Sequence, residues 1–396
     1  MIGRLLFKPA PRVLIVDPAI HSLGGHHFVA MERLSLELDE LSVPYRSLGA
    51  SSVDSRVRKA LGVSRCFSES IYGRTDWTKA EFRRRAKAMA RDLARCVRWH
   101  RPNLVILPTC DQVLALALAL AVNKAWSSWR PNVLLWLLFP PDRPGALEEY
   151  REAFSALRSV IGDDRKMHIC CETNRMALAF ADAIGIAIET HPGPNAKVMP
   201  DLGRPAGANG PIVACIGHAS AAKGYQLLPG AIVRVLEENP RIRFNIHGTI
   251  NARDVGADES PFSQLSKLGS RVELNMKPLP TLEYQKFFQA ADMMLLPYDP
   301  VTYRIRGSGI FNEATIAGKP IIVTAGCGFA EEAFAEGRAV AIDGLERDSI
   351  ANAIHYAVDH FEALRQCAQL HASELRINTL GGLLKRSLPG ESLRTD

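Results

Sequence analysis

The sequence lacks the cysteine spacing of a metal or redox site. It has 396 residues and eight cysteines, and none of them form a Cys-x-x-Cys pair. The spacing therefore supports neither a thiolate metal site nor a redox dithiol. Several cysteines lie in or beside apolar runs, where a thiol packs as a small hydrophobic side chain. We expect the protein to work in a reducing compartment.

Long apolar runs are also absent. The longest, residues 113–122, is ten residues long, whereas a membrane-spanning helix needs about 20. The N-terminal stretch lacks the apolar core and small-residue cleavage site of a signal peptide. We therefore expect a cytoplasmic protein. With only 29 glycines and 24 prolines, a collagen-like or broadly disordered chain is excluded.

Net charge is small, but it is unevenly placed. A formal charge of +6 does not by itself indicate nucleic-acid binding, and we expect none. Between Arg74 and Arg101, ten basic residues face three acidic ones. Apolar residues recur there at three- and four-residue steps, which predicts an amphipathic helix over Lys79–His100 with a basic outer face. Three interpretations stay open for this face: it is only solvated, it docks to an anionic membrane face, or it meets an acidic acceptor.

In the first half, short apolar runs alternate with longer amphipathic stretches. Predicted strands cover residues 12–17, 103–107, 132–139 and 167–171, each followed by a predicted helix, at 25–41, 111–126, 145–160 and 173–185. This alternation predicts a parallel sheet covered by helices on both faces.

A second series begins after a stretch rich in proline and glycine, residues 191–211, which is typical of a linker. Strands are predicted at 212–217, 243–247, 271–275, 293–297 and 319–323, and helices at 225–238, 282–291, 309–317 and 349–367, with a C-terminal helix to about residue 385. We therefore predict an α/β protein with two Rossmann-like, doubly wound domains, at residues 1–200 and 208–370. We expect 371–396 to pack back toward the first. The two domains would face a cleft, where ligands bind beyond the carboxyl ends of the strands.

One loop after a predicted strand in the first half holds glycines and histidines. Gly24 and Gly25 lie between the first strand and its helix, where glycine lets a backbone approach a phosphate. The loop is not G-x-G-x-x-G, so the dinucleotide fingerprint is absent. His26 and His27 begin the helix and either contact a ligand or face solvent.

Two loops of the second half suit a diphosphate. His218 and Lys223 follow the strand at 212–217. Farther on, Ser308 precedes a predicted helix, whose first amides, those of Gly309 and Ile310, are available to phosphate oxygens. One turn later, Glu313 is the only charge in an apolar helix, and its carboxylate can accept from two ribose hydroxyls.

Taken in order, these segments resemble a known family. The sequence has G-x5-K-G at 217–224, A-A-D-x4-P at 290–297 and G-S-G-I-F-x-E-A-x3-G-x-P at 307–320. The combination is similar to GT-B nucleotide-sugar glycosyltransferases of the retaining family four. Tyr303, Arg306, Ser308 and Gly309 form a Y-x-x-R-x-S-G pattern that resembles a bacterial subset of that family.

The resemblance implies roles for single residues. Lys223 and the amides of Gly309 and Ile310 would bind the donor diphosphate, and Glu313 would bind the ribose. The loop at 276–279 would hold the base mainly through its backbone. Gly24 and Gly25 would close on the diphosphate from the first domain.

Three departures from the family pattern concern the diphosphate loop, the sugar and the first domain. His218 stands where the family usually has arginine, and Ile305 stands where it has the first glutamate of E-x7-E. Tyr303, Arg306 and Ser308 lie near that position. Because the first glutamate is missing, the pattern does not identify the donor sugar. The histidine that many members carry after a first-domain strand is missing; Asp111, His26 or His27 takes its role in this interpretation.

The implied activity is glycosyl transfer from a nucleoside diphosphate sugar to a glycan or lipid-linked acceptor, with retention, in bacterial polysaccharide assembly. No Asp-x-Asp motif occurs to hold a metal, and we expect neither a metal nor a cofactor. The protein would work in the cytoplasm, at the periphery of the inner membrane face if the basic helix docks there. The alternatives are a GT-B nucleotide-sugar epimerase or hydrolase, and a non-catalytic nucleotide-binding or scaffold protein.

Overall fold

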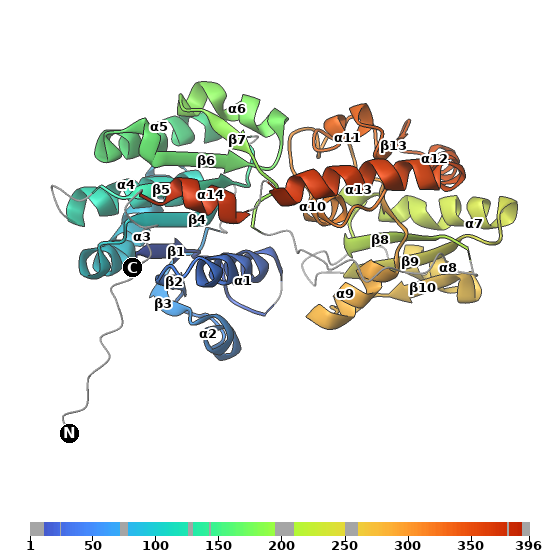
Figure 1. Cartoon of the computed structure of the whole chain (residues 1–396), viewed down its shortest axis with the longest axis horizontal. Helices are drawn as coiled ribbons and strands as arrows, with labels where there is room; N and C mark the ends of the chain where they lie inside the picture. Colours follow the sequence, from blue (N-terminus) through green and yellow to red (C-terminus); the bar gives the residue numbers. More distant parts are fainter. Residues whose placement is uncertain are drawn as a thin grey trace. The chain divides into compact units, whose positions relative to one another are not determined.

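The computed structural model of the chain contains two compact units (Figure 1). It describes residues 12–23, 25–71, 78–125, 130–141, 144–194, 210–249, 260–377 and 380–389. The first unit comprises Met1–Ala196 and Thr379–Asp396, and the second comprises Lys197–Asn378. The chain therefore leaves the first unit and returns to it.

The described part of the first unit has a seven-stranded parallel sheet with the order β3-β2-β1-β4-β5-β6-β7. Its strands are β1 (Val13–Val16), β2 (Tyr45–Ala50), β3 (Ser64–Phe67), β4 (Leu104–Cys110), β5 (Asn132–Leu137), β6 (Met167–Cys171) and β7 (Ile188–Thr190). Its helices are α1 (Gly25–Glu40), α2 (Ser55–Leu61), α3 (Lys79–His100), α4 (Gln112–Ala125), α5 (Ala146–Ile161), α6 (Asn174–Ile184) and α14 (Leu380–Ser387).

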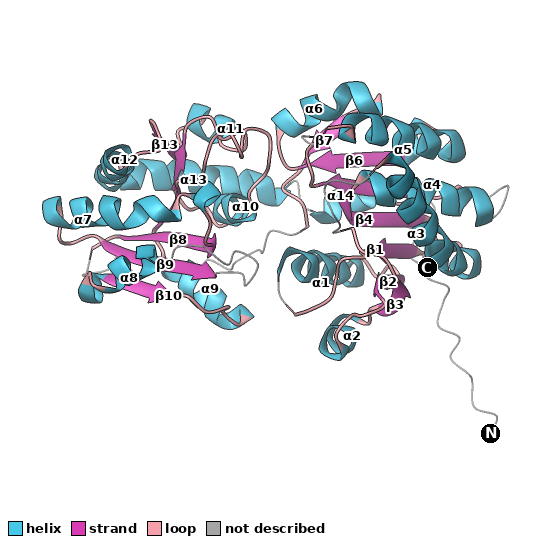
Figure 2. Cartoon of the chain, turned by 180° about the vertical axis from the view of Figure 1, so that it is seen from behind, coloured by secondary structure: helices cyan, strands magenta, loops and turns pink. Residues whose placement is uncertain are grey.

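Helices cover both faces of this sheet (Figure 2). Successive strand residues point to opposite faces, so a strand buried on both sides is apolar throughout. Leu14 packs with the helices α3, α4 and α5, whereas its neighbour Ile15 packs with α1 and α14. Helix α14 is thus part of the first unit's core, and the Asn132 side-chain amide donates to the Ser387 carbonyl at 2.8 Å.

The described part of the second unit has a six-stranded parallel sheet with the order β10-β9-β8-β11-β12-β13. Its strands are β8 (Ile212–His218), β9 (Arg243–Thr249), β10 (Val272–Asn275), β11 (Met293–Leu296), β12 (Ile321–Thr324) and β13 (Ala339–Ile342). Its α-helices are α7 (Leu228–Glu238), α8 (Ser260–Ser266), α9 (Thr281–Ala290), α10 (Gly309–Ile316), α11 (Glu331–Ala335), α12 (Arg347–Asp359) and α13 (Phe361–Ile377).

The second sheet is also enclosed by two apolar layers. Val213 and Cys215 of β8 pack with α7, α8 and α12, whereas Ala214 and Ile216 pack with α9 and α10. Helices α9 and α10, which carry candidate site residues, therefore lie on the same face of the sheet.

The predicted fold class is confirmed, as is the helix over Lys79–His100. The single long helix predicted at 349–367 is wrong. Helix α12 ends at Asp359, and α13 begins at Phe361 and continues to Ile377. No glycine or proline lies in this stretch, so the break at His360 has no local signal of the usual kind.

Candidate functional site

In each sheet, the order in which successive strands are added reverses at one pair of neighbouring strands. In the first unit the connections run outward from β1 to β3 and then return to β4, beside β1. In the second unit the same reversal occurs between β8 and β11. Ligands of doubly wound folds bind beyond the carboxyl ends of the strands at such a reversal. The predicted site residues follow these four strands or begin the helices after them.

In the second unit, the loops after β8 and β11 lie against each other. The Asp299 amide donates to the Ala222 carbonyl at 2.9 Å. Gly224 has a left-handed backbone (φ +69°), and a Cβ there would lie 2.1 Å from the Pro297 carbonyl oxygen. Only glycine fits this close approach, which fixes the neighbouring Lys223 at the strand edge.

Lys223 presents its ammonium group at this edge. Its Nζ lies 5.3 Å from the centre of the Tyr298 ring, and a Cβ on Gly217 would lie 3.1 Å from it. Within the described ranges no carboxylate forms an ion pair with Lys223. A half-buried cation with an aromatic ring as its close neighbour is suited to a bound anion.

The loop from β11 to α10 carries the predicted Tyr303, Arg306 and Ser308. The Tyr303 ring packs against the Tyr298 ring at a tilt of 42°, with ring centres 4.6 Å apart. The Gly328 amide donates to the Tyr303 carbonyl at 3.0 Å and so fixes the loop. Burial raises the pKa of Tyr303, while the nearby ammonium of Lys223 opposes the shift. Arg306 is exposed.

The start of α10 offers free backbone donors. Ser308 caps the helix, accepting from the Phe311 amide at 3.3 Å. In the described part of the chain, no acceptor is bonded to the amides of Gly309 and Ile310. A Cβ on Gly309 would meet nothing within 4 Å, so the space before these donors is open. This is the geometry of a helix N-terminus that binds an anion.

Glu313 lies one turn farther along α10 and is 7% exposed. The Tyr284 hydroxyl, on α9, donates to its Oε2. Tyr284 is a site residue that sequence reasoning missed, because 29 residues separate it from Glu313 and it lies in no motif.

The loop predicted to hold a base is fastened to β9. The His247 Nε2 lies 3.0 Å from the Lys277 carbonyl oxygen, and the Tyr225 hydroxyl donates to the His247 carbonyl at 2.7 Å. Burial lowers the pKa of His247, so the ring is neutral at pH 7 and its Nε2–H donates to Lys277. His247 was not predicted from the sequence.

In the first unit, a buried carboxylate holds one predicted histidine. Asp17, which follows β1, is fully buried and lies 2.7 Å from the Nδ1 of His27. Its other oxygen accepts from the Ala19 amide at 3.0 Å. The Thr109 hydroxyl of β4 lies 3.5 Å from the same Nδ1. The reversal between β1 and β4 thus brings together one predicted residue, His27, and two that were not predicted.

The other predicted site residues of the first unit differ in their exposure to solvent. His26 is exposed and its ring lies 4.1 Å from that of His27. Gly25 has a left-handed backbone (φ +73°) with open space around it, whereas Gly24 is outside the described residues. Asp111 is 4% exposed and accepts from the Leu114 amide at 2.7 Å. Burial raises the pKa of Asp111 to about 6.

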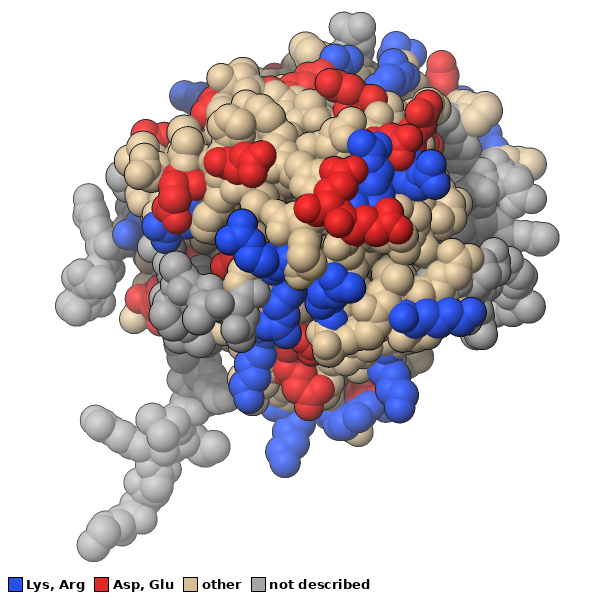
Figure 3. Space-filling model, turned by 90° about the vertical axis from the view of Figure 1, so that its right-hand side faces the viewer, with Lys and Arg blue, Asp and Glu red and all other residues tan. Residues whose placement is uncertain are grey.

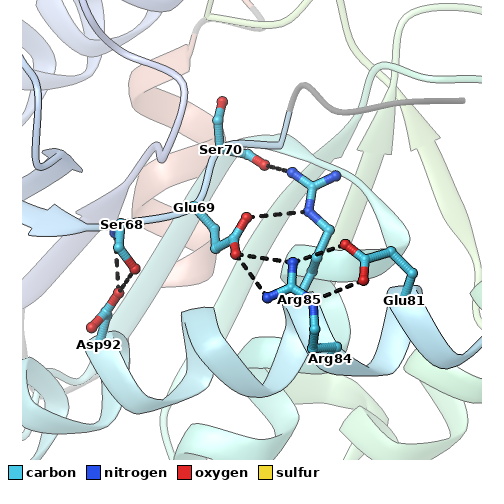
Figure 4. A network of polar contacts seen from close by, with 7 residues as sticks. All are labelled: Ser68, Glu69, Ser70, Glu81, Arg84, Arg85 and Asp92. Carbon is cyan, nitrogen blue, oxygen red and sulfur yellow. Dashed lines mark hydrogen bonds and ion pairs between the residues drawn. The ribbon is translucent and has the colours of Figure 1, made fainter.

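Helix α3 is less basic than its sequence suggests, because neighbouring elements supply carboxylates. Arg83 forms a two-point contact with Glu152 of α5, at 2.7 and 2.9 Å. In Figure 4, Arg84 and Arg85 converge on Glu69. Lys87 and Arg91 remain exposed and have no ion-pair partner in the part of the chain described.

The surface of the second unit shows the same balance of charge. Figure 3 shows basic and acidic side chains intermixed on one face. Arg234, for example, lies 2.9 Å from Asp348 and 3.0 Å from Glu238. The described surface therefore gives no new support for nucleic-acid binding.

The spacing argument about cysteines overlooked one thiol pair. The Sγ atoms of Cys66 on β3 and Cys96 on α3 lie 3.6 Å apart. The hydrogen bond from Cys66 lowers the pKa of Cys96 to about 7. The tertiary fold, rather than a local motif, joins these two residues.

No cluster of three or more metal-ligating side chains occurs in the described ranges. Over the same ranges, no helix combines the length and the apolar character needed to cross a membrane.

The second unit matches a known sequence family. Residues 210–360 match the family described as Glycosyl transferases group 1. This segment contains Lys223, Gly309 and Glu313. No curated protein matches the chain.

Solved structures match over nearly the whole chain. A glycosyltransferase from Rickettsia africae has a TM-score of 0.67 at 12% identity, covering 98% of this chain and 100% of the other. Alr3699/HepE from Anabaena, in complex with UDP-glucose, has a TM-score of 0.60 at 15% identity, covering 95% and 99%. A putative UDP-N-acetylglucosamine 2-epimerase from Listeria monocytogenes has a TM-score of 0.54 at 13% identity, covering 91% of each chain.

The chain has the GT-B fold. In this GT-B chain the second unit carries the cation, the free helix amides and the carboxylate, and the first unit carries the buried Asp17 with His27.

Proposed function

We propose that this GT-B protein transfers a glycosyl group from a nucleoside diphosphate sugar to an acceptor hydroxyl. The observation that carries the proposal is the arrangement at the reversal between β8 and β11. There an ammonium group, two free helix amides and a nearly buried carboxylate follow one another along one edge of the sheet. These groups match the diphosphate and ribose of a nucleotide.

The chemistry follows from the charge that develops on the leaving group. When the bond between the sugar and the diphosphate breaks, the sugar becomes oxocarbenium-like and negative charge gathers on the phosphate oxygens. Lys223 and the amides of Gly309 and Ile310 would stabilise that charge as preorganised donors. No step of this scheme needs a metal or a cofactor. Retention, with the leaving phosphate as base for the acceptor hydroxyl, remains part of the proposal.

The donor nucleotide is proposed to be a uridine diphosphate sugar. The support is the Anabaena structure, which was solved in complex with UDP-glucose. Tyr303, Arg306 and Ser308 would face the sugar, in place of the glutamate that Ile305 replaces.

The acceptor side is assigned to the first unit. His27 is the best supported of its three candidates, because Asp17 orients the ring from a buried position. The acceptor would be a glycan or a lipid-linked sugar in bacterial polysaccharide assembly. A cytoplasmic location is part of this proposal, at the periphery of the inner membrane face if the basic helix α3 docks there.

One alternative has its own support. The Listeria structure is a putative epimerase, so the same fold is compatible with a reaction on the nucleotide sugar alone. Incubation with UDP-sugars and no acceptor separates the two activities by nuclear magnetic resonance. Conversion of the donor into an epimer favours the alternative, whereas an unchanged donor favours transfer.

The first experiment is a thermal-shift screen with UDP, GDP, ADP and their sugars. A ligand that binds only the folded chain raises its melting temperature by mass action. We expect UDP to raise it in the wild type and in Lys267→Ala, an exposed lysine of the same unit, but not in Lys223→Ala. If no nucleotide diphosphate shifts the wild type, the protein is a non-catalytic scaffold and the proposed function is wrong.

A further inference from the structure

We propose that Cys66 and Cys96 form a site of reversible oxidation, at which a hydroperoxide converts the two thiols into a disulfide between β3 and α3. The site includes no residue to which the proposed function assigns a role, so it stands whether or not the chain transfers a sugar.

The two thiols come from elements that the fold packs together. Strand β3 is an edge strand of the first sheet, and α3 lies against it. The Sγ atoms of Cys66 and Cys96 lie 3.6 Å apart, and both side chains pack against the apolar cluster of the first unit. Because a disulfide bond is about 2 Å long, its closure requires only a small approach of the two sulfur atoms.

A second contact already holds the strand and the helix in register. The Asp92 carboxylate of α3 accepts from the amide and the hydroxyl of Ser68, at 3.1 and 3.0 Å (Figure 4). The Cys66 Sγ lies 3.6 Å from the Asp92 carbonyl oxygen. Since Asp92 and Cys96 are four residues apart, they share one face of α3. A disulfide would therefore add a covalent link where the two elements are already in contact.

The surroundings of the pair make Cys96 the nucleophile. The hydrogen bond that Cys66 donates lowers the pKa of Cys96 to about 7. The guanidinium groups of Arg46 and Arg95 act in the same direction, whereas burial and Asp92 oppose it. The contact with Cys96 and burial raise the pKa of Cys66, so Cys66 keeps its proton. Both residues are partly exposed, and the thiolate is the form of cysteine that reacts with a small oxidant.

The oxidation balances with hydrogen peroxide as the oxidant. The Cys96 thiolate attacks one oxygen, the O–O bond breaks, and a sulfenic acid forms while hydroxide leaves. The Cys66 sulfur then attacks the Cys96 sulfur, so the S–S bond forms and the S–O bond breaks. The departing hydroxide takes the Cys66 proton and becomes water. Two electrons have then passed from the thiols to the peroxide, and a small thiol reverses the change by exchange.

The inference is tested on the full chain, reduced and then treated with one equivalent of hydrogen peroxide. The remaining thiols are blocked with iodoacetamide, and mass spectrometry of the digested protein identifies linked peptides. We expect the Cys66–Cys96 link to be the main disulfide and to disappear with dithiothreitol. Cys367→Ala, which removes the other partly exposed thiol, is the control and should form the link to the same extent.

Two variants test the order of the steps. In Cys66→Ala the sulfenic acid has no neighbouring thiol to attack it, so a dimedone adduct should accumulate on Cys96. In Cys96→Ala the nucleophile is gone, so Cys66 should be labelled far less. Equal labelling of the single thiol in the two variants would show that Cys96 is not the residue oxidised first. Melting temperatures of the reduced variants show whether each is folded.

The wild-type result alone can overturn the proposal. If peroxide produces no Cys66–Cys96 link, or links several cysteine pairs in similar amounts, the two thiols are not a specific site of oxidation. If Cys96 of the wild type accumulates as the dimedone adduct without a disulfide, Cys66 does not complete the reaction and the proposal is wrong.

Discussion

Asp17 and His27 form a hydrogen-bonded pair of 2.7 Å at the first unit's reversal of winding, with the carboxylate fully buried and the ring partly exposed. The second carboxylate oxygen is occupied by the Ala19 amide. The loop and the start of α1 are therefore tied to one buried group.

Replacement of this carboxylate should destabilise the fold. Asp17→Ala leaves the Ala19 amide and one histidine nitrogen without their acceptor, so we expect a loss of about 1–3 kcal/mol in the free energy of unfolding. His27→Ala removes only the outer partner and should cost less. Urea unfolding followed by circular dichroism measures both. Equal losses in the two variants would contradict a central role for Asp17.

Two glycines should respond differently to alanine. Gly224→Ala places a Cβ 2.1 Å from the Pro297 carbonyl oxygen at a left-handed backbone, so the loops must separate and the melting temperature should fall by several degrees. Gly309→Ala adds a methyl group in open space and should melt as the wild type does. Because that space is where a phosphate would bind, Gly309→Ala should still weaken UDP binding. A wild-type melting temperature for Gly224→Ala would contradict the close approach.

Asp111 should make stability depend on pH. Its pKa rises from 3.8 in the unfolded chain to about 6 in the folded chain, so the folded chain holds the proton more tightly. The free energy of unfolding contributed by this group therefore falls as the pH rises from about 4 to about 6, and the loss is complete above that window. Asp111→Asn keeps a capping oxygen for the Leu114 amide and should melt at a higher temperature than the wild type at pH 7.5.

The same comparison at pH 4 provides the check on this prediction, since the gain should shrink there. Asp163→Asn is the matched control: Asp163 caps a helical turn in solvent, and its hydrogen bonds with Arg165 lower its pKa. That variant should show no gain at pH 7.5. A pH-independent effect of Asp111→Asn would argue against the raised pKa.

Cys96 should react faster with an alkylating reagent than the buried Cys215. The Cys66 hydrogen bond lowers the pKa of Cys96 to about 7, whereas burial raises that of Cys215 to about 12. Since the thiolate is the nucleophile, labelling of Cys96 by iodoacetamide should rise between pH 6 and 8. Mass spectrometry of digested protein identifies the labelled residue. Cys66→Ala should move the rise to higher pH, and an unchanged profile would contradict the assigned cause.

Electrostatic docking of α3 to a membrane should depend on the residues without a carboxylate partner. Lys87→Ala with Arg91→Ala should weaken binding to anionic vesicles about 30-fold, at about 1 kcal/mol for each basic residue. Arg83→Gln serves as the control, because Glu152 already pairs with Arg83. Co-sedimentation with anionic and neutral vesicles measures the effect. Equal binding to both lipids would exclude electrostatic docking.

The architecture was predictable because its signals are local. Strands buried on both faces are continuous apolar runs, such as Val13–Val16 and Asn132–Leu137, and amphipathic stretches lie between them. The strands β2, β3, β7 and β13 were missed, and β7 (Ile188–Thr190) is only three residues long. Tyr45–Ala50 and Ser64–Phe67 contain arginine and serine, since β3 is an edge strand and β2 lies beside it. Ala339–Ile342 is only four residues long.

The site was predictable only where a strand end and a motif coincide. Lys223, Gly309 and Glu313 lie on such motifs, whereas Tyr284 and Asp17 act through side chains distant in sequence. The charge on α3 was overestimated for the same reason, since Glu69 and Glu152 lie on other segments. Contacts between elements carry no signature in a single sequence.

The return of the chain to the first unit determines when that unit can be completed during synthesis. Leu383 and Leu384 of α14 are at most 1% exposed and pack in the same cluster as Trp136 of β5. A ribosome must therefore produce the whole second unit before the core beneath β5 can close. A fragment that stops at residue 194 would expose this apolar surface, so the first unit should be expressed with residues 380–389 joined to it by a linker.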